Sequence, residues 1–133
     1  MLLCDAASAS EGKLYILGAG WSQILEPDIP VNMALAVKIA VPWDQSNEPH
    51  EIRVALVTGD GEPVQVGDEA VQAHGKFETG RPPGLAPGTP LDAVFALSFA
   101  ALTLEANSYV WELEIDGTPM ARTPFRVGPV QRR

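Results

Sequence analysis

The chain has 133 residues, of which 46% are hydrophobic and 20% charged, a composition typical of one globular domain spanning residues 1–133 and too apolar for a disordered chain. The 17 acidic residues outnumber the 9 basic ones, and the resulting net charge of −8 repels nucleic-acid backbones and anionic membrane surfaces. We therefore expect no nucleic-acid and no membrane partner.

The compartment is predicted from the N-terminus and from Cys4, the only cysteine. One cysteine cannot form an internal disulfide, and it favours a reducing environment. The first residues lack the basic start and the apolar length of a signal peptide, and no stretch approaches the roughly 18 apolar residues of a membrane helix. These features predict a cytoplasmic protein.

The first half of the chain alternates apolar and polar residues with the period of a β-strand. Residues 2–7 predict a strand that turns at residues 8–12, and residues 13–21 predict a second one. Gly18 and Gly20 fall on one face of that second strand, which indicates a β-bulge or the close approach of another backbone.

The middle of the chain continues this pattern. Residues 34–41 predict a half-buried strand that ends at Pro42, because proline cannot donate to a sheet ladder. Residues 52–57 predict the next strand, a Gly-Asp-Gly turn follows, and a weaker strand is expected at residues 73–79.

Residues 81–90 form one long loop with four prolines and two glycines, and the prolines stiffen it toward extended conformations. Residues 91–104 allow two interpretations. Thr89 and Pro90 are suited to the start of a helix, whereas Phe95, Leu97 and Phe99 alternate with small residues as in a strand. Helical spacing would place polar residues on the apolar stripe, so the alternation favours the strand.

The C-terminal part predicts a hairpin. Residues 109–116 alternate strongly, Asp116-Gly117 suits a type I′ turn, and a closing strand places Phe125 and Val127 on its inner face. About eight short strands without βαβ alternation predict an all-β fold, an antiparallel β-sandwich of immunoglobulin-like type with one long Pro/Gly-rich loop.

Three segments resemble an uncharacterised family of short, mainly actinobacterial domain-of-unknown-function proteins. They are LCDA at residues 3–6 with GKLYILGAGW at 12–21, GRPPGL at 80–85 with PGTP at 87–90, and YVWELEIDG at 109–117. The resemblance extends over the whole chain and implies a compact β-domain without an assigned activity or catalytic residues.

A looser resemblance is to immunoglobulin-like sandwiches, in which a late strand begins with a tyrosine that bonds back to upstream backbone. Tyr109 occupies a suitable position for that contact, but the Cys–Trp–Cys core signature is absent from the sequence.

The residues that carry chemistry are few. Nucleophilic catalysis needs a nucleophile beside a base, and a metal needs three or four converging ligands. His50 beside Glu51, and His74 with Glu78, lack metal-site spacing, and Cys4 fits a small buried residue. We therefore predict no catalytic, cofactor-binding or metal-binding residues, with both histidines as surface residues beside strands.

The remaining candidates are surfaces. Arg81 would present a cation on the stiffened loop and clamp a partner's carboxylate, with Trp43 as an aromatic anchor nearby. Trp21 and Trp111 lie on apolar faces and are predicted to be core residues. The predicted interaction surface comprises Arg81, Trp43, Pro82, Pro83 and Leu85. The alternative for the loop is a plain connection between sheets, and the alternative for Trp43 is a cap on the core.

Two partners follow from these surfaces: an unidentified protein, and a second copy of the chain that packs on the smooth alanine face of residues 34–41. We predict a non-enzymatic protein-interaction or structural module. The alternative is a β-sandwich that binds a small ligand or carbohydrate, with Trp43 as the stacking platform.

Overall fold

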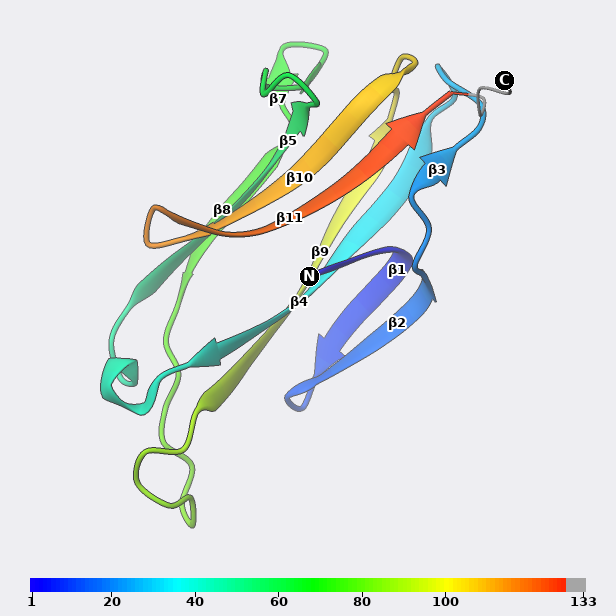
Figure 1. Cartoon of the computed structure of the whole chain (residues 1–133). Helices are drawn as coiled ribbons and strands as arrows, with labels where there is room; N and C mark the ends of the chain where they lie inside the picture. Colours follow the sequence, from blue (N-terminus) through cyan, green and yellow to red (C-terminus); the bar gives the residue numbers. More distant parts are fainter. Residues whose placement is uncertain (129–133) are drawn as a thin grey trace, which may run out of the picture.

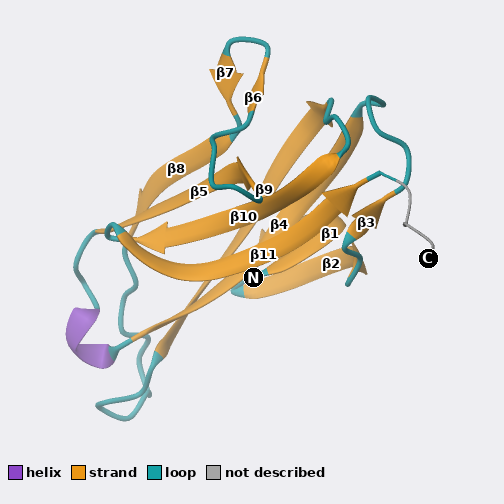
Figure 2. Ribbon diagram, turned by 45° about the horizontal axis from the view of Figure 1, so that its top comes forward, coloured by secondary structure: helices purple, strands orange, loops and turns teal. Residues whose placement is uncertain are grey.

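The structure, a computed structural model, describes residues 1–128. Two main β-sheets pack face to face, and a small hairpin stands at one end (Figures 1 and 2). The four-stranded sheet has the order β2-β1-β4-β9, and the five-stranded sheet has the order β3-β11-β10-β5-β8. The elements in chain order are β1 Leu2–Ser10, β2 Lys13–Ala19, β3 Gln23–Ile24, β4 Val31–Val41, the 3₁₀-helix η1 Trp43–Gln45, β5 His50–Thr58, β6 Gln65–Val66, β7 Glu69–Ala70, β8 Gln72–Phe77, β9 Leu91–Leu102, β10 Asn107–Ile115 and β11 Thr118–Val127.

The predicted all-β sandwich is confirmed. Of the eleven strands in residues 1–128, the eight that have six or more residues correspond to the eight that alternation predicts. The three others, β3, β6 and β7, have two residues each, too short for a period-two signal. In the described part of the chain, the strand pairs are antiparallel except the short β3–β11 pair, which is parallel.

The ambiguous segment at residues 91–104 is a strand, and the helix alternative is wrong. β9 pairs with β4 along nearly its whole length, with Leu97 opposite Leu35 and Phe95 opposite Val37. Phe95, Leu97 and Phe99 pack against the core. Alternation was therefore a better guide here than the capping signal at residues 89–90.

The predicted turn at Asp116-Gly117 also forms. Both residues have positive φ, +51° and +79°, as a type I′ turn requires. Ile115 pairs with Thr118 across it. The turn fixes the register of β10 against β11 and holds the Asp116 side chain beside the first residues of β5, to which β10 also pairs.

The core lies between the two sheets. Leu35 and Val37 of β4 face Val54 and Leu56 of β5, with Trp111 of β10 fully buried among them. The ring of Trp111 lies 4.5 Å from that of Phe99, centroid to centroid. Trp21, which is half-buried, packs edge-on against Phe125 at 6.3 Å. Both tryptophans therefore serve packing, as the sequence predicts.

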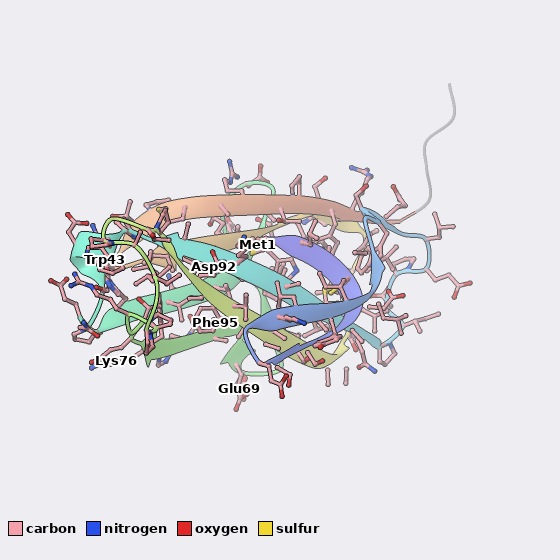
Figure 3. All side chains as sticks on the ribbon, turned by 90° about the horizontal axis from the view of Figure 1, so that it is seen from below. Met1, Trp43, Glu69, Lys76, Asp92 and Phe95 are labelled. Atoms are coloured by element: carbon pink, nitrogen blue, oxygen red, sulfur yellow. The ribbon has the colours of Figure 1, made fainter. Side chains whose placement is uncertain are left out.

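The first part of the alanine face of β4 is covered by the chain itself, which corrects the prediction of a free surface there, while Ala40 is exposed. Ala34 and Ala36 are only 1% and 3% exposed and form a buried cluster with Cys4, against which Ala7 and Leu14 pack. β1 and β2 both contact β9, on the far side of β4, because the hairpin curls across the sheet (Figure 3). The hairpin therefore occupies the part of this face that holds Ala34 and Ala36.

Gly18 has the positive φ of +67°, and the Asp5 side chain fills the position that a Cβ atom would take. The predicted close approach at this glycine is therefore made by a side chain rather than by a backbone. A larger residue at position 18 would displace the Asp5 carboxylate and strain the backbone.

The Tyr109 hydroxyl donates a 2.7 Å hydrogen bond to the carbonyl of Glu105 just upstream. This is the contact that the sequence predicted for Tyr109. Burial raises the pKa of this phenol, so it stays a donor at neutral pH. The wider immunoglobulin-like resemblance stays a prediction.

Candidate functional site

One end of the sandwich brings together two of the residues singled out in the sequence. The β4–β5 connection, which contains η1, and the long β8–β9 loop lie at the same end (Figures 1 and 2). The guanidinium carbon of Arg81 lies 4.3 Å from the centroid of the Trp43 ring, a cation–π geometry. Residues separated by 38 positions in the sequence thus form one contact.

The guanidinium is also hydrogen-bonded within the chain. Arg81 Nη2 donates to the Trp43 carbonyl at 2.8 Å, and Nε donates to Ser46 Oγ at 2.6 Å. The Ser46 hydroxyl in turn donates to the Trp43 carbonyl, and the backbone N–H of Asn47 donates to the Thr79 carbonyl. Arg81 therefore fastens the loop to η1, a role that the sequence did not suggest and that occupies part of the fork expected to clamp a partner.

A groove of about 690 Å³ lies beside this contact, between the end of β8, the start of β9 and the loop that joins them, and Gly12 in the β1–β2 turn also borders it. Pro82 and Leu85 line it, and Leu85 is 40% exposed. Pro83 is exposed on the same loop. The structure therefore gathers the five predicted surface residues at one end of the molecule, and it places the loop's apolar side chains over a cavity.

Trp43 also borders a second, open hollow of about 520 Å³, lined by Ala40, Pro42, Asp44, Gly88 and Pro90. The tryptophan is half-buried rather than fully exposed. Figure 3 shows it at the end of the sandwich, while Asp92 and Phe95 follow along β9. Trp43 therefore lines the second hollow alone, and Pro90 lines both.

His50 is the residue whose environment the sequence prediction got wrong. It is buried, only 6% exposed, and its ring packs on Phe77. Its Nδ1 donates to Asp116 Oδ2 and its Nε2 donates to the Gln45 carbonyl, each at 2.8 Å. Because both partners only accept hydrogen bonds, both ring nitrogens carry a proton and the imidazole is cationic.

The hydrogen bond to Asp116 is the main cause that raises the pKa of His50 above its ordinary value of 6.5, and the Gln45 carbonyl adds to it. The pKa of Asp116 is lowered, first by the backbone N–H of Glu51 and then by His50. The pair is exposed on the Asp116 side. The only sequence signal for it was strand pairing, which places the turn after β10 against the start of β5.

Cys4 and His74, the other candidate groups, lie apart from each other and form no reactive cluster among the described residues. Cys4 is fully buried, its thiol donates to the Ala34 carbonyl at 3.4 Å, and burial raises its pKa. His74 is exposed on β8, as predicted. Within residues 1–128, no three histidine, cysteine or acidic side chains converge as metal ligands would.

Within that same range, no helix has the length and apolar character needed to span a membrane. None of the curated proteins matches the chain. A family model, described as a family of unknown function (DUF6941), matches residues 1–128 and confirms the predicted membership in an uncharacterised domain family. The chain therefore belongs to the family of unknown function DUF6941.

Proposed function

We propose that this protein is a non-enzymatic interaction module that binds a partner protein at the end formed by η1 and the β8–β9 loop. The observation that carries the proposal is the Arg81–Trp43 stack, which holds the proline-rich loop rigid over a groove of about 690 Å³. A loop fixed before binding loses little conformational entropy when it meets its partner. The exposed Leu85 supplies an apolar anchor on that rigid support.

The state of the reactive groups supports a binding role over a catalytic one. The Cys4 thiol is buried, and its raised pKa keeps it in the poorly nucleophilic protonated form. His50 is held in its cationic form by two acceptors, so it has no free nitrogen with which to act as a base. We further propose that the protein works in the cytoplasm, where its single thiol stays reduced.

The rival function is the binding of a small ligand or carbohydrate. The hollow that Trp43 shares with Pro42 and Pro90 favours it, because sugars stack on aromatic rings in such apolar surroundings. The guanidinium of Arg81 already stacks on the Trp43 ring and competes for that surface. We therefore rank this function second.

Trp43→Ala separates the two functions. Tagged wild-type protein, Trp43→Ala and Leu85→Ala are used as bait in extract of the source cells, with Leu25→Ala as the control, because Leu25 is 61% exposed and lies outside the residues that line either hollow. The proposal expects one protein band that both site variants lose and the control retains. A tryptophan fluorescence change with monosaccharides, lost in Trp43→Ala, would support the rival instead. If no bait variant differs from wild type, the proposed function is wrong.

We also propose that a second copy pairs along β2 rather than on the partly covered alanine face of β4. Tyr15, Ile16 and Leu17 are 55%, 39% and 71% exposed in a strand that ends its sheet. Natural sheets normally protect such an edge from pairing. An antiparallel two-fold pair centred on Ile16 sets Tyr15 against the partner's Leu17, and Lys13 against the partner's Ala19.

Charge supports this register. The chain carries a net charge of −8, so two copies repel each other over most of their surfaces. β2 contains no acidic residue, and Lys13 is its only charged side chain. In the register centred on Ile16 no two like charges stand opposite one another, so β2 is a strand along which two copies can approach without setting carboxylates against each other.

A further inference from the structure

We propose that the groove binds an extended, cationic segment of the partner protein, which adds as a strand to the free edge of β9. This inference rests on the proposed function and names the chemistry of the partner. It is drawn from the course of the groove, from its charge and from one buried hydroxyl.

The groove follows the edge of a strand. Its lining includes five consecutive residues of β9, from Leu91 to Phe95. Consecutive strand residues point to opposite faces of a sheet, so a groove that touches all five runs along the backbone rather than over one face. Within residues 1–128, β9 pairs with β4 alone. Its outer N–H and C=O groups are therefore open to a strand from another chain.

The charge of the groove favours a cationic occupant. Among the described residues that line it, Glu78 and Asp92 are the two charged ones, and both are acidic. Lys38 lies 3.7 Å from Asp92, but both side chains are more than half exposed, and such ion pairs are weak. The net charge of −8 adds a favourable long-range field for a basic segment.

Thr79 gives an independent reason to expect a polar ligand in the groove. This residue lines the groove and is only 9% exposed. Its hydroxyl oxygen is buried without a hydrogen-bond partner among the described residues. An unpaired buried hydroxyl carries a desolvation cost, and a donor or acceptor from an incoming segment would remove that cost.

The remaining lining is apolar and specifies the alternation of the segment. Phe77 and Phe95 meet edge to face at 5.0 Å, and Leu85 with Pro82 and Pro90 lines the loop side. A strand that pairs with β9 would direct every second side chain toward this apolar surface. The side chains between them would reach the acids. The segment that fits best therefore alternates apolar and basic residues.

The test uses an eight-residue peptide of alternating lysine and valine, capped at both ends, and a glutamate–valine peptide of the same length. Binding is measured by isothermal titration calorimetry, and the amides of residues 91–95 are followed by NMR. We expect the lysine peptide alone to bind, with shifts concentrated in those amides. Methylation of every second backbone nitrogen of the peptide, in the phase that faces β9, should abolish binding although the side chains are unchanged.

Charge variants complete the test. The double variant with Glu78→Lys and Asp92→Lys should weaken binding about tenfold or more, and the milder Glu78→Gln with Asp92→Asn should weaken it less. The matched control carries Asp60→Lys and Glu69→Lys, two exposed acids near the β6–β7 hairpin at the opposite end (Figure 1). If the control weakens binding equally, or if both methylated phases bind as well as the parent, attraction is unspecific and the inference is wrong.

The two proposals fail separately. If the lysine peptide does not bind while Trp43→Ala still removes a protein partner, the strand-addition inference is overturned and the interaction module stands. If neither the peptide nor a partner depends on this end of the molecule, both are overturned.

Discussion

The four-stranded sheet ends in two free strands, β2 and β9, that offer the same backbone groups in different surroundings. Along β2, Tyr15, Ile16 and Leu17 stand exposed with no acid among them. Along the first part of β9 runs a groove with two carboxylates, under a loop that Arg81 fastens in place. The side chains around an edge, and not the edge itself, therefore indicate which partner can pair with it.

The difference has a local cause. β2 lies next to β1, and the residues opposite its large side chains are small: Ala6 faces Leu17, Ala7 faces Ile16, and Ser8 faces Tyr15. Small neighbours cannot shield large ones, so the β2 side chains stay uncovered. β9 instead follows the long proline-rich loop, which turns back over its first residues. The β2 edge is thus apolar and suits pairing with a second copy of itself, whereas the β9 edge is acidic and partly covered by the loop.

The largest expected effect comes from a core substitution on β4, the strand from which both halves of the four-stranded sheet extend. Leu35 is fully buried in the core between the two sheets, on β4, which lies between β1 and β9 in the four-stranded sheet. Leu35→Ala should lower the free energy of unfolding by about 2–5 kcal/mol, since it leaves a cavity in the core. Urea unfolding measures this loss. A loss below about 0.5 kcal/mol would show that the packing around β4 is not as described.

Arg81→Ala should affect the β9 edge alone. It removes one cation–π contact and two hydrogen bonds, which together correspond to about 1–2 kcal/mol of local stability. Hydrogen exchange should become faster in residues 79–90 and stay unchanged in β2. Arg81→Lys, which keeps the charge but not the planar fork, should rescue only part of the protection. Equal acceleration in both regions would contradict a local anchor.

A rise in pH should also loosen the β9 end before the β2 edge. The pKa of His50 is raised in the folded state, so its contribution is complete below the unfolded value of 6.5 and is lost as the pH rises through the folded pKa. Because His50 Nε2 binds the Gln45 carbonyl of η1, the loss reaches the Trp43 contact.

The stability that Asp116 contributes changes with pH in the opposite direction. The pKa of Asp116 is lowered from 3.8, so its contribution holds above that value and disappears as the pH falls through the folded pKa. Urea unfolding of the wild type and of Asp116→Asn, from acidic to alkaline pH, measures both the Asp116 and the His50 contributions. If the difference between the two proteins does not shrink above pH 6.5, the cationic assignment of His50 is wrong.

The smallest expected change in stability is at the β2 edge. Ile16→Lys should change the free energy of unfolding by less than about 0.5 kcal/mol, because the side chain is already partly exposed. It should nevertheless raise the concentration at which the protein self-associates by about tenfold or more, since two lysines would then meet at the centre of the pair. Sedimentation equilibrium measures this, with Met120→Lys as the exposed control. A wild-type protein that stays monomeric at high concentration would refute the pairing.

Period-two alternation predicted the long strands and the sandwich because most of these strands bury one face against the core, although β2 alternates and leaves its large side chains exposed. It could not reveal β3, β6 and β7, whose two residues each contain no period. It also misjudged the second face of β4, because alanines on an otherwise polar pattern look solvent-exposed until the β1–β2 hairpin is seen to cover Ala34 and Ala36.

The candidate site was predicted in its parts and not in its assembly. Trp43 and the loop stood out by residue type, but no pattern in the sequence indicates that Arg81 would stack on Trp43 from 38 residues away. The burial of His50 depends on Asp116, which only strand register brings near. The Thr79 hydroxyl has no hydrogen-bond partner among the described residues, and this too depends on the tertiary structure around it.

The position of Cys4 has one practical consequence. The thiol is sealed beneath the β1–β2 hairpin, and its Sγ donates to the Ala34 carbonyl. A labelling reagent can reach the thiol only while the hairpin is detached from β4. The rate of labelling in native buffer therefore measures how often this local opening occurs. The hairpin also contains β2. If a second copy pairs along β2, the rate of Cys4 labelling should therefore fall as the protein concentration rises, and this needs no engineered probe.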